Sequence, residues 1–271
     1  MRRLLIRPGA VGDCILALPA LQRLRVDYTE VWISTPAVSL VQFADRVQSI
    51  ASTGLDLVGI GDLEIPASLT RRLQSFDSIV SWYGANRPPF REALLRLGLP
   101  AEFHAALPPA DYAGHAIDFF ARQVGAPDGL TPHVSVNSQP QRDTVVIHPF
   151  SGSPRKNWPL PSFLKLAERL TCRVEWTAGP EEELPVELRP VRFTNLLDLA
   201  NWLSGARLYV GNDAGISHLA AASGVQTVAL FGPTNPQLWA PRGTHVTVLN
   251  HTPLADLSVE AVLESANRLL R

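Results

Sequence analysis

The chain has 271 residues, of which 46% are hydrophobic and 18% charged, and its formal net charge is −1. This composition supports a substantial core and excludes a largely disordered protein. The nearly balanced charge gives no general electrostatic reason to expect nucleic acid as a partner. Cys14 and Cys172 lie far apart without CxxC spacing, which fits a reducing, cytoplasmic compartment and argues against a disulfide framework or a zinc site. No apolar run reaches the roughly 18 residues of a membrane span.

The N-terminal stretch MRRLLIRPGAVGDCILALPAL looks like a secretory signal, because two arginines precede an apolar run. However, Arg7 and Asp13 interrupt the run, and its ALP segment is a poor cleavage site. We therefore interpret the stretch as folded structure. It predicts a buried strand over residues 4–7, a loop over 9–12, and a helix from Asp13 onward with apolar residues at helical spacing.

Short apolar segments bounded by glycine and proline alternate with helical patterns along the rest of the chain. This alternation predicts an α/β protein with parallel sheets covered by helices on both faces. The further predicted strands are 31–34, 78–82, 144–148, 173–176, 207–210 and 227–231, and the further predicted helices are 113–124, 161–170 and 258–270.

The segment APDGLTPHVSVNSQPQRD, residues 126–143, has the Pro, Ser, Asn and Gln content of a linker. The strand–helix pattern restarts after it, which predicts two Rossmann-like halves with a cleft between them. Ligands of such sheets bind beyond the carboxyl ends of the strands, and a cleft suits a reaction with two substrates. We place the N-terminal domain at 1–135, the C-terminal domain at 136–255 and a terminal helix at 256–271.

The loop RPGAVGD joins the first predicted strand to the first helix. Its two glycines allow a tight turn and close approach of a ligand. The spacing matches neither GxGxxG nor GxxxxGK[ST], and a carboxylate at a helix start would repel a diphosphate. Asp13 is therefore a candidate general base toward another substrate. The alternative is that Asp13 only caps its helix.

Two loops of the second half have features of anion sites. In HPFSGSPRKNWP, Arg155 and Lys156 are adjacent cations in a Gly/Ser/Pro loop, which suits a phosphate, although an exposed basic turn is the alternative. His148 at its start is expected to be structural. In VGNDAGISHLAAA, small residues open a helix whose free N–H groups attract an anion. There Ser217 could add a hydroxyl, and Asp213 could orient the loop or meet a sugar hydroxyl. A well-capped buried helix is the alternative reading.

Two more strand-end loops complete the pattern. FGPTNP, residues 231–236, is expected at the same cleft. TAGPEE, residues 177–182, offers an acidic residue for ribose hydroxyls, either Glu181 or Glu182, with a solvated acidic turn as the alternative. The chain contains no DxD, no GxSxG and no close metal-ligand spacing among its histidines. No metal or other cofactor is therefore expected.

Three segments, in order, resemble glycosyltransferase family 9, the bacterial ADP-heptose:lipopolysaccharide heptosyltransferases. RPGAVGDCILALPALQRLR is similar to the N-terminal G-x-x-G-D signature of that family. IHPFSGSPRKNWP is similar to its Lys-x-Trp-Pro loop. VGNDAGISHLAAASGVQTVALFGPTNP resembles its D-[ST]-G-x-x-H-[LI]-A helix start and G-P-T-[DN]-P loop. The resemblance implies a GT-B fold of two facing Rossmann-like domains, with the C-terminal helix packing back toward the first domain.

The resemblance also implies roles for residues. Asp13 matches the proposed general base, and Lys156 the lysine on the donor phosphate. The residues implied in donor binding are Ser153, Lys156, Glu181, Glu182, Asp213, Ala214, Gly215, Ser217 and His218. The chain departs from the family in a short N-terminal half and in Ala214, where Ser or Thr is common. The acceptor candidates are Gly12, Asn86, Arg87 and Arg91, with Arg71 and Arg72 as further ones; these arginines could bind an anionic sugar or simply be solvated.

The function expected from the resemblance is metal-independent, inverting transfer of a heptose-type sugar from an ADP-sugar to a lipopolysaccharide core or related glycan. Two alternatives remain: a nucleotide-binding GT-B homologue without transferase activity, and a GT-B nucleotide-sugar epimerase. A glycolipid acceptor would bring the protein to the cytoplasmic face of the inner membrane as a peripheral protein, although the chain shows no clear amphipathic anchor.

Overall fold

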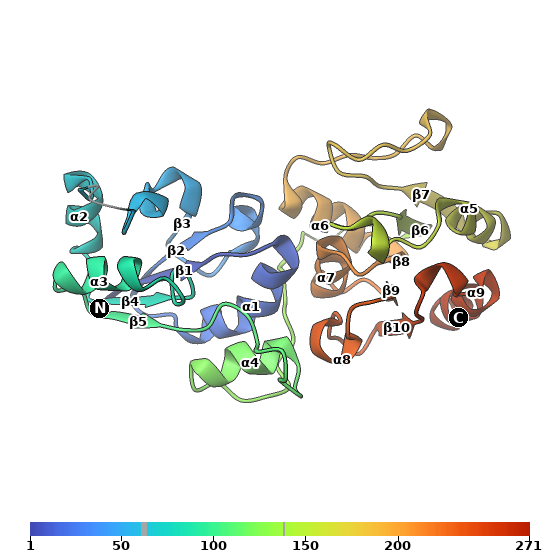
Figure 1. The fold of residues 1–271 in the computed structure, drawn as a ribbon. Helices are drawn as coiled ribbons and strands as arrows, with labels where there is room; N and C mark the ends of the chain where they lie inside the picture. The colour runs from blue at the N-terminus through green and yellow to red at the C-terminus, as the bar shows by residue number, and fades with distance from the viewer. Residues whose placement is uncertain (61–63, 138) are drawn as a thin grey trace. The chain divides into compact units, whose positions relative to one another are not determined.

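The structure is a computed structural model that describes residues 1–60, 64–137 and 139–271. The chain divides into two compact units (Figure 1). The first unit contains Met1–Tyr112 and Ala116–Leu130, and the second contains Ala113–His115 and Thr131–Arg271. The change of unit at residues 130–131 falls within the linker-like segment 126–143. Part of that segment is built into the second unit, because Val134 is fully buried and its N–H donates to the carbonyl of Ala222.

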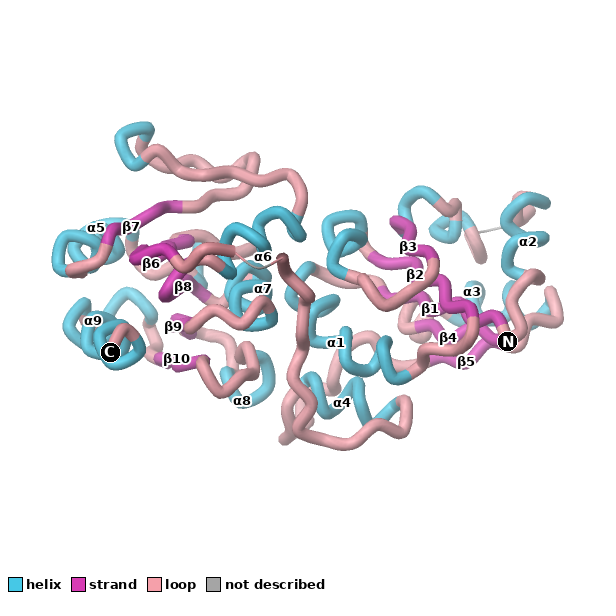
Figure 2. Tube along the Cα trace, turned by 180° about the vertical axis from the view of Figure 1, so that it is seen from behind, coloured by secondary structure: helices cyan, strands magenta, loops and turns pink. Residues whose placement is uncertain are grey.

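The first unit is a five-stranded parallel sheet in the order β3-β2-β1-β4-β5, seen as magenta strands in Figure 2. Its strands are β1 (Arg2–Arg7), β2 (Tyr28–Ile33), β3 (Arg46–Ser49), β4 (Ser78–Ser81) and β5 (Ala101–Phe103). Its α-helices are α1 (Val11–Arg23), α2 (Ala67–Leu73), α3 (Pro88–Arg96) and α4 (Ala116–Gln123), and short 3-10 turns are η1 (Thr35–Leu40), η2 (Ile50–Ser52) and η3 (Leu55–Leu57).

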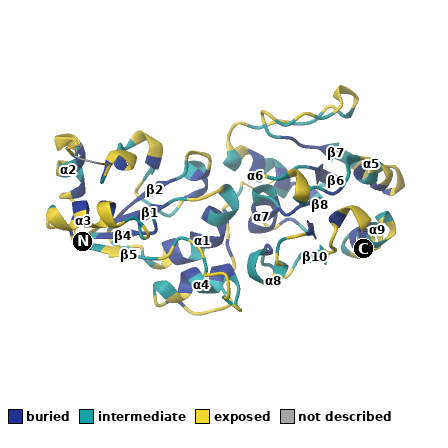
Figure 3. Ribbon diagram, in the orientation of Figure 1, coloured by how far each residue is buried: buried dark blue, intermediate teal, exposed yellow. Residues whose placement is uncertain are grey.

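The central strand β1 is buried on both faces, which explains its continuous apolar sequence. Leu4 and Ile6 join a cluster with residues of α2 and α3. Leu5 and Arg7 alternate with them and are also buried. The guanidinium of Arg7 lies over the ring of Phe120 in α4, and α4 packs against α1. Helices therefore cover both faces of the sheet, as the dark strands of Figure 3 illustrate.

The second unit is also a five-stranded parallel sheet, in the order β10-β9-β8-β6-β7. Its strands are β6 (Arg142–His148), β7 (Arg173–Trp176), β8 (Ala206–Asn212), β9 (Thr227–Phe231) and β10 (Val246–Asn250). Its α-helices are α5 (Leu160–Arg169), α6 (Leu196–Ser204), α7 (Gly215–Ala222), α8 (Pro236–Trp239) and α9 (Val259–Leu269), with 3-10 turns η4 (Pro154–Lys156), η5 (Val186–Leu188) and η6 (Leu254–Asp256). The predicted pair of parallel-sheet, Rossmann-like halves is confirmed.

The last helix, α9, lies with its apolar face in the core of the second unit, where Val262 and Ala266 are buried in one cluster with residues of α5 and of the central strands. On the surface, Arg169 of α5 pairs with Glu260 of α9 at 2.6 Å. These contacts make α9 part of the second unit.

Among the described residues, no helix combines the length and apolar character that crossing a membrane requires.

Candidate functional site

Parallel pairing brings the carboxyl ends of the strands of each unit to one edge of its sheet. In the second unit, β6 and β8 are neighbours. The loop after β6 carries Lys156, and the turn after β8 carries Asp213 and leads into α7. The loop after β7 carries Glu182. Three of the loops predicted to bind a donor therefore start from adjoining strands of one sheet.

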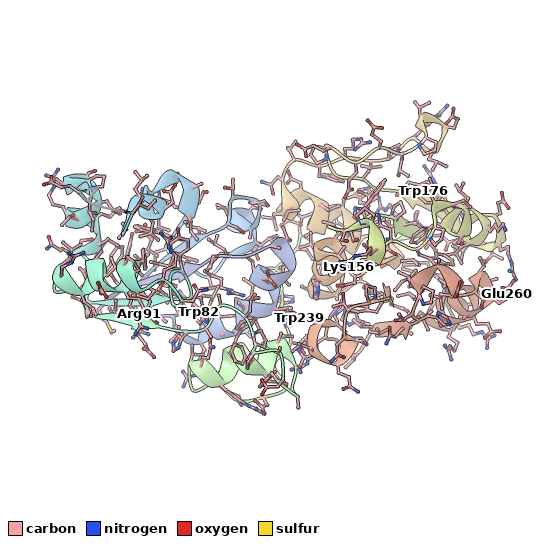
Figure 4. The ribbon with its side chains drawn as sticks, in the orientation of Figure 1. Trp82, Arg91, Lys156, Trp176, Trp239 and Glu260 are labelled. Atoms are coloured by element: carbon pink, nitrogen blue, oxygen red, sulfur yellow. The ribbon has the colours of Figure 1, made fainter. Side chains whose placement is uncertain are left out.

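Lys156 and Asp213 meet across two of these loops. The Nζ atom of Lys156 lies 2.8 Å from Oδ2 of Asp213, with side chains 34% and 8% exposed. The contact is an ion pair, but its geometry is not that of a hydrogen bond. Oδ2 of Asp213 has no hydrogen-bond partner among the described residues. Figure 4 labels Lys156 on the loop that follows β6. The predicted phosphate lysine is thus held beside the start of α7 by a nearly buried carboxylate.

The start of α7 offers backbone donors next to this pair. Ala214 is the N-cap residue in extended conformation, and it provides no side-chain cap. Ala214, Gly215 and Ile216 are half-buried, so that this turn is accessible. The first N–H groups of a helix have no partner within the helix, and its dipole adds partial positive charge there. The positive charge of Lys156 and the first N–H groups of α7 therefore lie at one accessible turn.

Ser217, a predicted donor residue, is held inside the turn before α7. The side chain is fully buried, and its Oγ donates to the carbonyl of Asn212 at 2.5 Å. Tyr209 lies 3.3 Å from the same hydroxyl. The hydroxyl therefore stabilises the turn between β8 and α7 from within. The small side chain of Ser217 fits in the limited space under the turn.

His218, also predicted to contact the donor, is buried one residue further along α7. Burial lowers the pKa of His218 to about 4. The charge of Asp213 opposes this shift, and the charges of His115 and Lys156 add to it. The imidazole is accordingly neutral near pH 7. It can contribute one N–H donor and one acceptor nitrogen but no positive charge.

His218 makes the stability of the protein sensitive to acid. Its folded pKa lies below the ordinary 6.5, so the unfolded chain binds the extra proton first and stability is lost as pH falls from about 6.5 to about 4. At about 1.4 kcal/mol per pKa unit, the loss between pH 7 and pH 5 is roughly 2 kcal/mol. Urea unfolding of wild type and His218→Asn at pH 7 and pH 5 measures this loss. Between the two pH values, the unfolding free energy of His218→Asn should fall by roughly 2 kcal/mol less than that of wild type. The unfolding free energy of the exposed control His133→Asn should fall as much as that of wild type. An equal loss in His218→Asn would contradict the assignment.

Asn212 organises the site and was missed by the sequence analysis. Its side chain is fully buried: Oδ1 accepts from the N–H of Trp158 at 2.9 Å, and Nδ2 donates to the carbonyl of Pro149 at 2.9 Å. Both ends of the Lys156 loop are thus tied to the end of β8. The only sequence signal was a polar residue at the end of an apolar strand, which does not reveal a partner more than 50 residues away.

The Lys156 loop also bonds to itself. Ser153, a predicted donor residue, contributes its backbone carbonyl, which accepts from the N–H of Lys156 at 2.9 Å and from the hydroxyl of Ser151 at 2.8 Å. The Ser151 hydroxyl also lies 2.7 Å from Oδ1 of Asn157. These contacts shape the turn that presents Lys156, whereas Arg155 beside it is exposed.

The two candidate glutamates differ sharply. Glu181 is exposed. Glu182 is half-buried, and its Oε2 lies 3.0 Å from Nε2 of His148 and accepts the N–H of Gly179 at 2.6 Å. Burial raises the pKa of Glu182, but the hydrogen bond and charge of His148, the N–H of Gly179 and the charge of Arg192 outweigh it, so the pKa lies below its ordinary value. Glu182 is thus a fixed carboxylate.

In the first unit, Asp13 lies in the first turn of α1, and its Oδ2 accepts the N–H of Ala10 at 3.0 Å. Asp13 therefore caps its helix, whatever else it does. Its Oδ1 makes no hydrogen bond with a described residue. Gly9 before it has φ +124°, and a Cβ there would lie 2.9 Å from Cβ of Asp13, so the turn requires glycine. Gly12, an acceptor candidate, is half-buried in the same turn.

Arg7 braces the Asp13 turn from inside. Its guanidinium is 1% exposed, donates to the carbonyls of Asp13 at 3.1 Å and Ala106 at 3.0 Å, and lies 4.4 Å from the ring centroid of Phe120. Burial lowers the pKa of Arg7, while Cys14 and Asp13 oppose the shift.

The other acceptor candidates follow β4, which neighbours β1 in the sheet, so they lie at the same edge as Asp13. Asn86 is exposed. Arg87 donates to the hydroxyl of Tyr83 at 2.9 Å, and Arg91 on α3 lies 5.3 Å from the ring centroid of Phe103 (Figure 4). The further candidate Arg72 lies on α2 and pairs with the buried Glu30 of β2.

No group of three or more His, Cys, Asp or Glu side chains suited to a metal ion occurs within residues 1–60, 64–137 and 139–271.

The two parallel-sheet, Rossmann-like units define the protein as a member of the GT-B class. The fold matches the E. coli ADP-heptose LPS heptosyltransferase II with a TM-score of 0.76 and 18% identity, over 100% of this chain and 98% of that one. The family model "Glycosyltransferase family 9 (heptosyltransferase)" matches residues 127–265. The chain belongs to this family.

The chain is also similar to two further heptosyltransferases. Lipooligosaccharide heptosyltransferase 2 of Haemophilus influenzae is 30% identical over 152 residues, covering 43% of this chain and 44% of the relative. The match therefore spans less than half the length of that curated protein. A third similar protein, the heptosyltransferase TibC, is described as dodecameric and iron-containing; its structure matches with a TM-score of 0.62 and 14% identity over 99% of this chain and 76% of that one.

Proposed function

We propose that the protein is an inverting glycosyltransferase that moves a heptose-type sugar from an ADP-sugar to a lipopolysaccharide core or related glycan. The observation that carries this proposal is the Lys156–Asp213 pair at the start of α7, inside the region that matches the family model. A lysine beside a helix N-terminus suits the diphosphate of a nucleotide-sugar. The names of the relatives support the choice of heptose and of a lipopolysaccharide acceptor.

In the proposed reaction, Asp13 accepts the proton of the acceptor hydroxyl as that oxygen attacks the anomeric carbon. The bond from this carbon to the diphosphate oxygen breaks, and the configuration inverts. Negative charge then builds on the departing ADP. Lys156 and the first N–H groups of α7 stabilise that charge as it develops, which lowers the barrier. The acceptor candidates Gly12, Asn86, Arg87 and Arg91 belong to the first unit, and the donor residues belong to the second.

We further propose that the transfer needs no metal ion. The proposal rests on chemistry that the chain supplies itself, namely a lysine and a helix start where the diphosphate charge develops. Equal turnover before and after treatment with a chelator supports it, and turnover restored only by an added cation such as iron contradicts it. A glycolipid acceptor would place the reaction at the cytoplasmic face of the inner membrane.

The decisive experiment tests purified protein for binding of ADP and ADP-sugars and then for sugar transfer to truncated core acceptors. We expect micromolar ADP binding and a product heavier than the acceptor by one heptose residue in mass spectrometry. Nucleotide binding without transfer to any core acceptor would favour a homologue without transferase activity. Isomerisation of the ADP-sugar at unchanged mass, without acceptor, would favour an epimerase.

A further inference from the structure

His148 is more than a packing residue at the end of β6. Its side chain is 4% exposed, and its Nε2 lies 3.0 Å from Oε2 of Glu182, 34 residues further along the chain. The sequence alone predicts only a structural histidine here. An apolar side chain would fill the same space without burying two ring nitrogens, so the polar contact with Glu182 needs a reason of its own.

The second ring nitrogen indicates where the proton lies. Nδ1 of His148 is buried and has no hydrogen-bond partner among the described residues. A buried N–H without a partner is costly and rare, whereas an unpaired acceptor is tolerated more often. The tautomer with hydrogen on Nε2 therefore fits, and it donates to Oε2 of Glu182.

The loop that carries Glu182 is fixed at several points. Oε2 also accepts the N–H of Gly179 at 2.6 Å, and Arg192 donates to the backbone carbonyls of Gly179 and Glu182. His148 and the N–H of Gly179 therefore both contact Oε2 and leave the other carboxylate oxygen, Oε1. Oε1 makes no hydrogen bond with a described residue, and the side chain is 30% exposed. A fixed carboxylate with one accessible oxygen is a receptor for hydroxyl groups.

We infer that His148 is a positioning residue that aims Oε1 of Glu182 at the ribose hydroxyls of the donor nucleotide. This inference rests on the proposed function, which places an ADP-sugar at this edge of the second unit. It also selects Glu182 over Glu181, which is exposed and lacks such support. The strand-end histidine, and not the glutamate alone, then sets the preference of the site for a nucleotide with intact ribose hydroxyls.

The test compares the affinities of ADP and 2′,3′-dideoxy-ADP by calorimetry, because their ratio reports on the hydroxyls and is insensitive to a general loss of binding. We expect wild type to prefer ADP by about tenfold, the value of one charge-assisted hydrogen bond. His148→Gln keeps an amide nitrogen near the Nε2 position and should keep the ratio. His148→Asn places its amide near Nδ1, out of reach of Glu182, and should bring the ratio close to one. Glu182→Gln should lower it, and the neighbouring control Glu181→Gln should not.

The inference would be overturned by a wild-type ratio near one, by an unchanged ratio in His148→Asn, or by a ratio that falls to one in Glu181→Gln. The proposed function would survive each of these outcomes as long as wild type binds ADP. Absence of ADP and ADP-sugar binding in wild type would instead overturn the proposed function, and the inference with it. Thermal unfolding identifies any variant that does not fold. If His148→Asn is unfolded, Glu182→Asp is tested in its place, because its side chain is one methylene too short to reach His148. A ratio that falls to about one in this variant supports the inference, and a retained ratio overturns it.

Discussion

Asp13→Asn is expected to lower turnover by roughly 10²- to 10³-fold while ADP affinity stays within a few-fold of wild type. General base catalysis contributes this order of rate enhancement, and an amide cannot take the acceptor proton. Asparagine nevertheless keeps a side-chain oxygen that can accept the N–H of Ala10, now at 3.0 Å from Oδ2 of Asp13. The substitution therefore removes the base and spares the cap. Steady-state kinetics of sugar transfer, with ADP calorimetry beside them, measure both effects.

Asp13→Ala is the matched variant, because it removes the base and the cap together. It should match Asp13→Asn in turnover and lose about 1 kcal/mol more in unfolding free energy, which is typical of a lost helix cap. If Asp13→Asn keeps turnover within a few-fold of wild type and only Asp13→Ala loses stability, Asp13 is a helix cap and not the base.

A strand buried along its whole length could be predicted from the sequence, whereas two short edge strands could not. The strand expected over 227–231 matches β9, because a buried run of β-branched and apolar residues ends at a clear turn signal. The edge strands β3 and β5 were missed. Arg46–Ser49 and Ala101–Phe103 are short, and none of their residues is fully buried, so they carry no apolar run to detect.

The loops of the candidate site could also be found from the sequence, but their partners could not. A parallel sheet fixes where each strand-end loop lies, which placed the loops of Lys156 and Asp213 at one edge in advance. The pairing of Lys156 with Asp213 and of His148 with Glu182 depends on side-chain reach between distant segments. The buried position of the Ser217 hydroxyl could not be predicted for the same reason, since nothing local shows which way a helix-start side chain points.

Lys156→Met is expected to weaken ADP binding roughly 10- to 100-fold, the value of a charge-assisted contact with phosphate. It should also lower the unfolding free energy by about 2 kcal/mol, because it leaves the nearly buried carboxylate of Asp213 without its cation. Arg155→Met, at the exposed neighbouring cation, is the control and should change neither quantity by much. Calorimetry with ADP and urea unfolding of the free protein measure the two effects separately.

The double variant Lys156→Met/Asp213→Asn separates the donor role of Lys156 from its structural role. Removing both charges together leaves no unpaired buried ion, so stability should return most of the way to wild type. ADP affinity should stay low, because the cation that meets the diphosphate is still missing. Asp213→Asn alone should bind ADP at least as well as wild type, since the diphosphate no longer competes with a carboxylate for Lys156. If the double variant regains ADP affinity along with stability, Lys156 acts on the fold of its loop and not on the nucleotide.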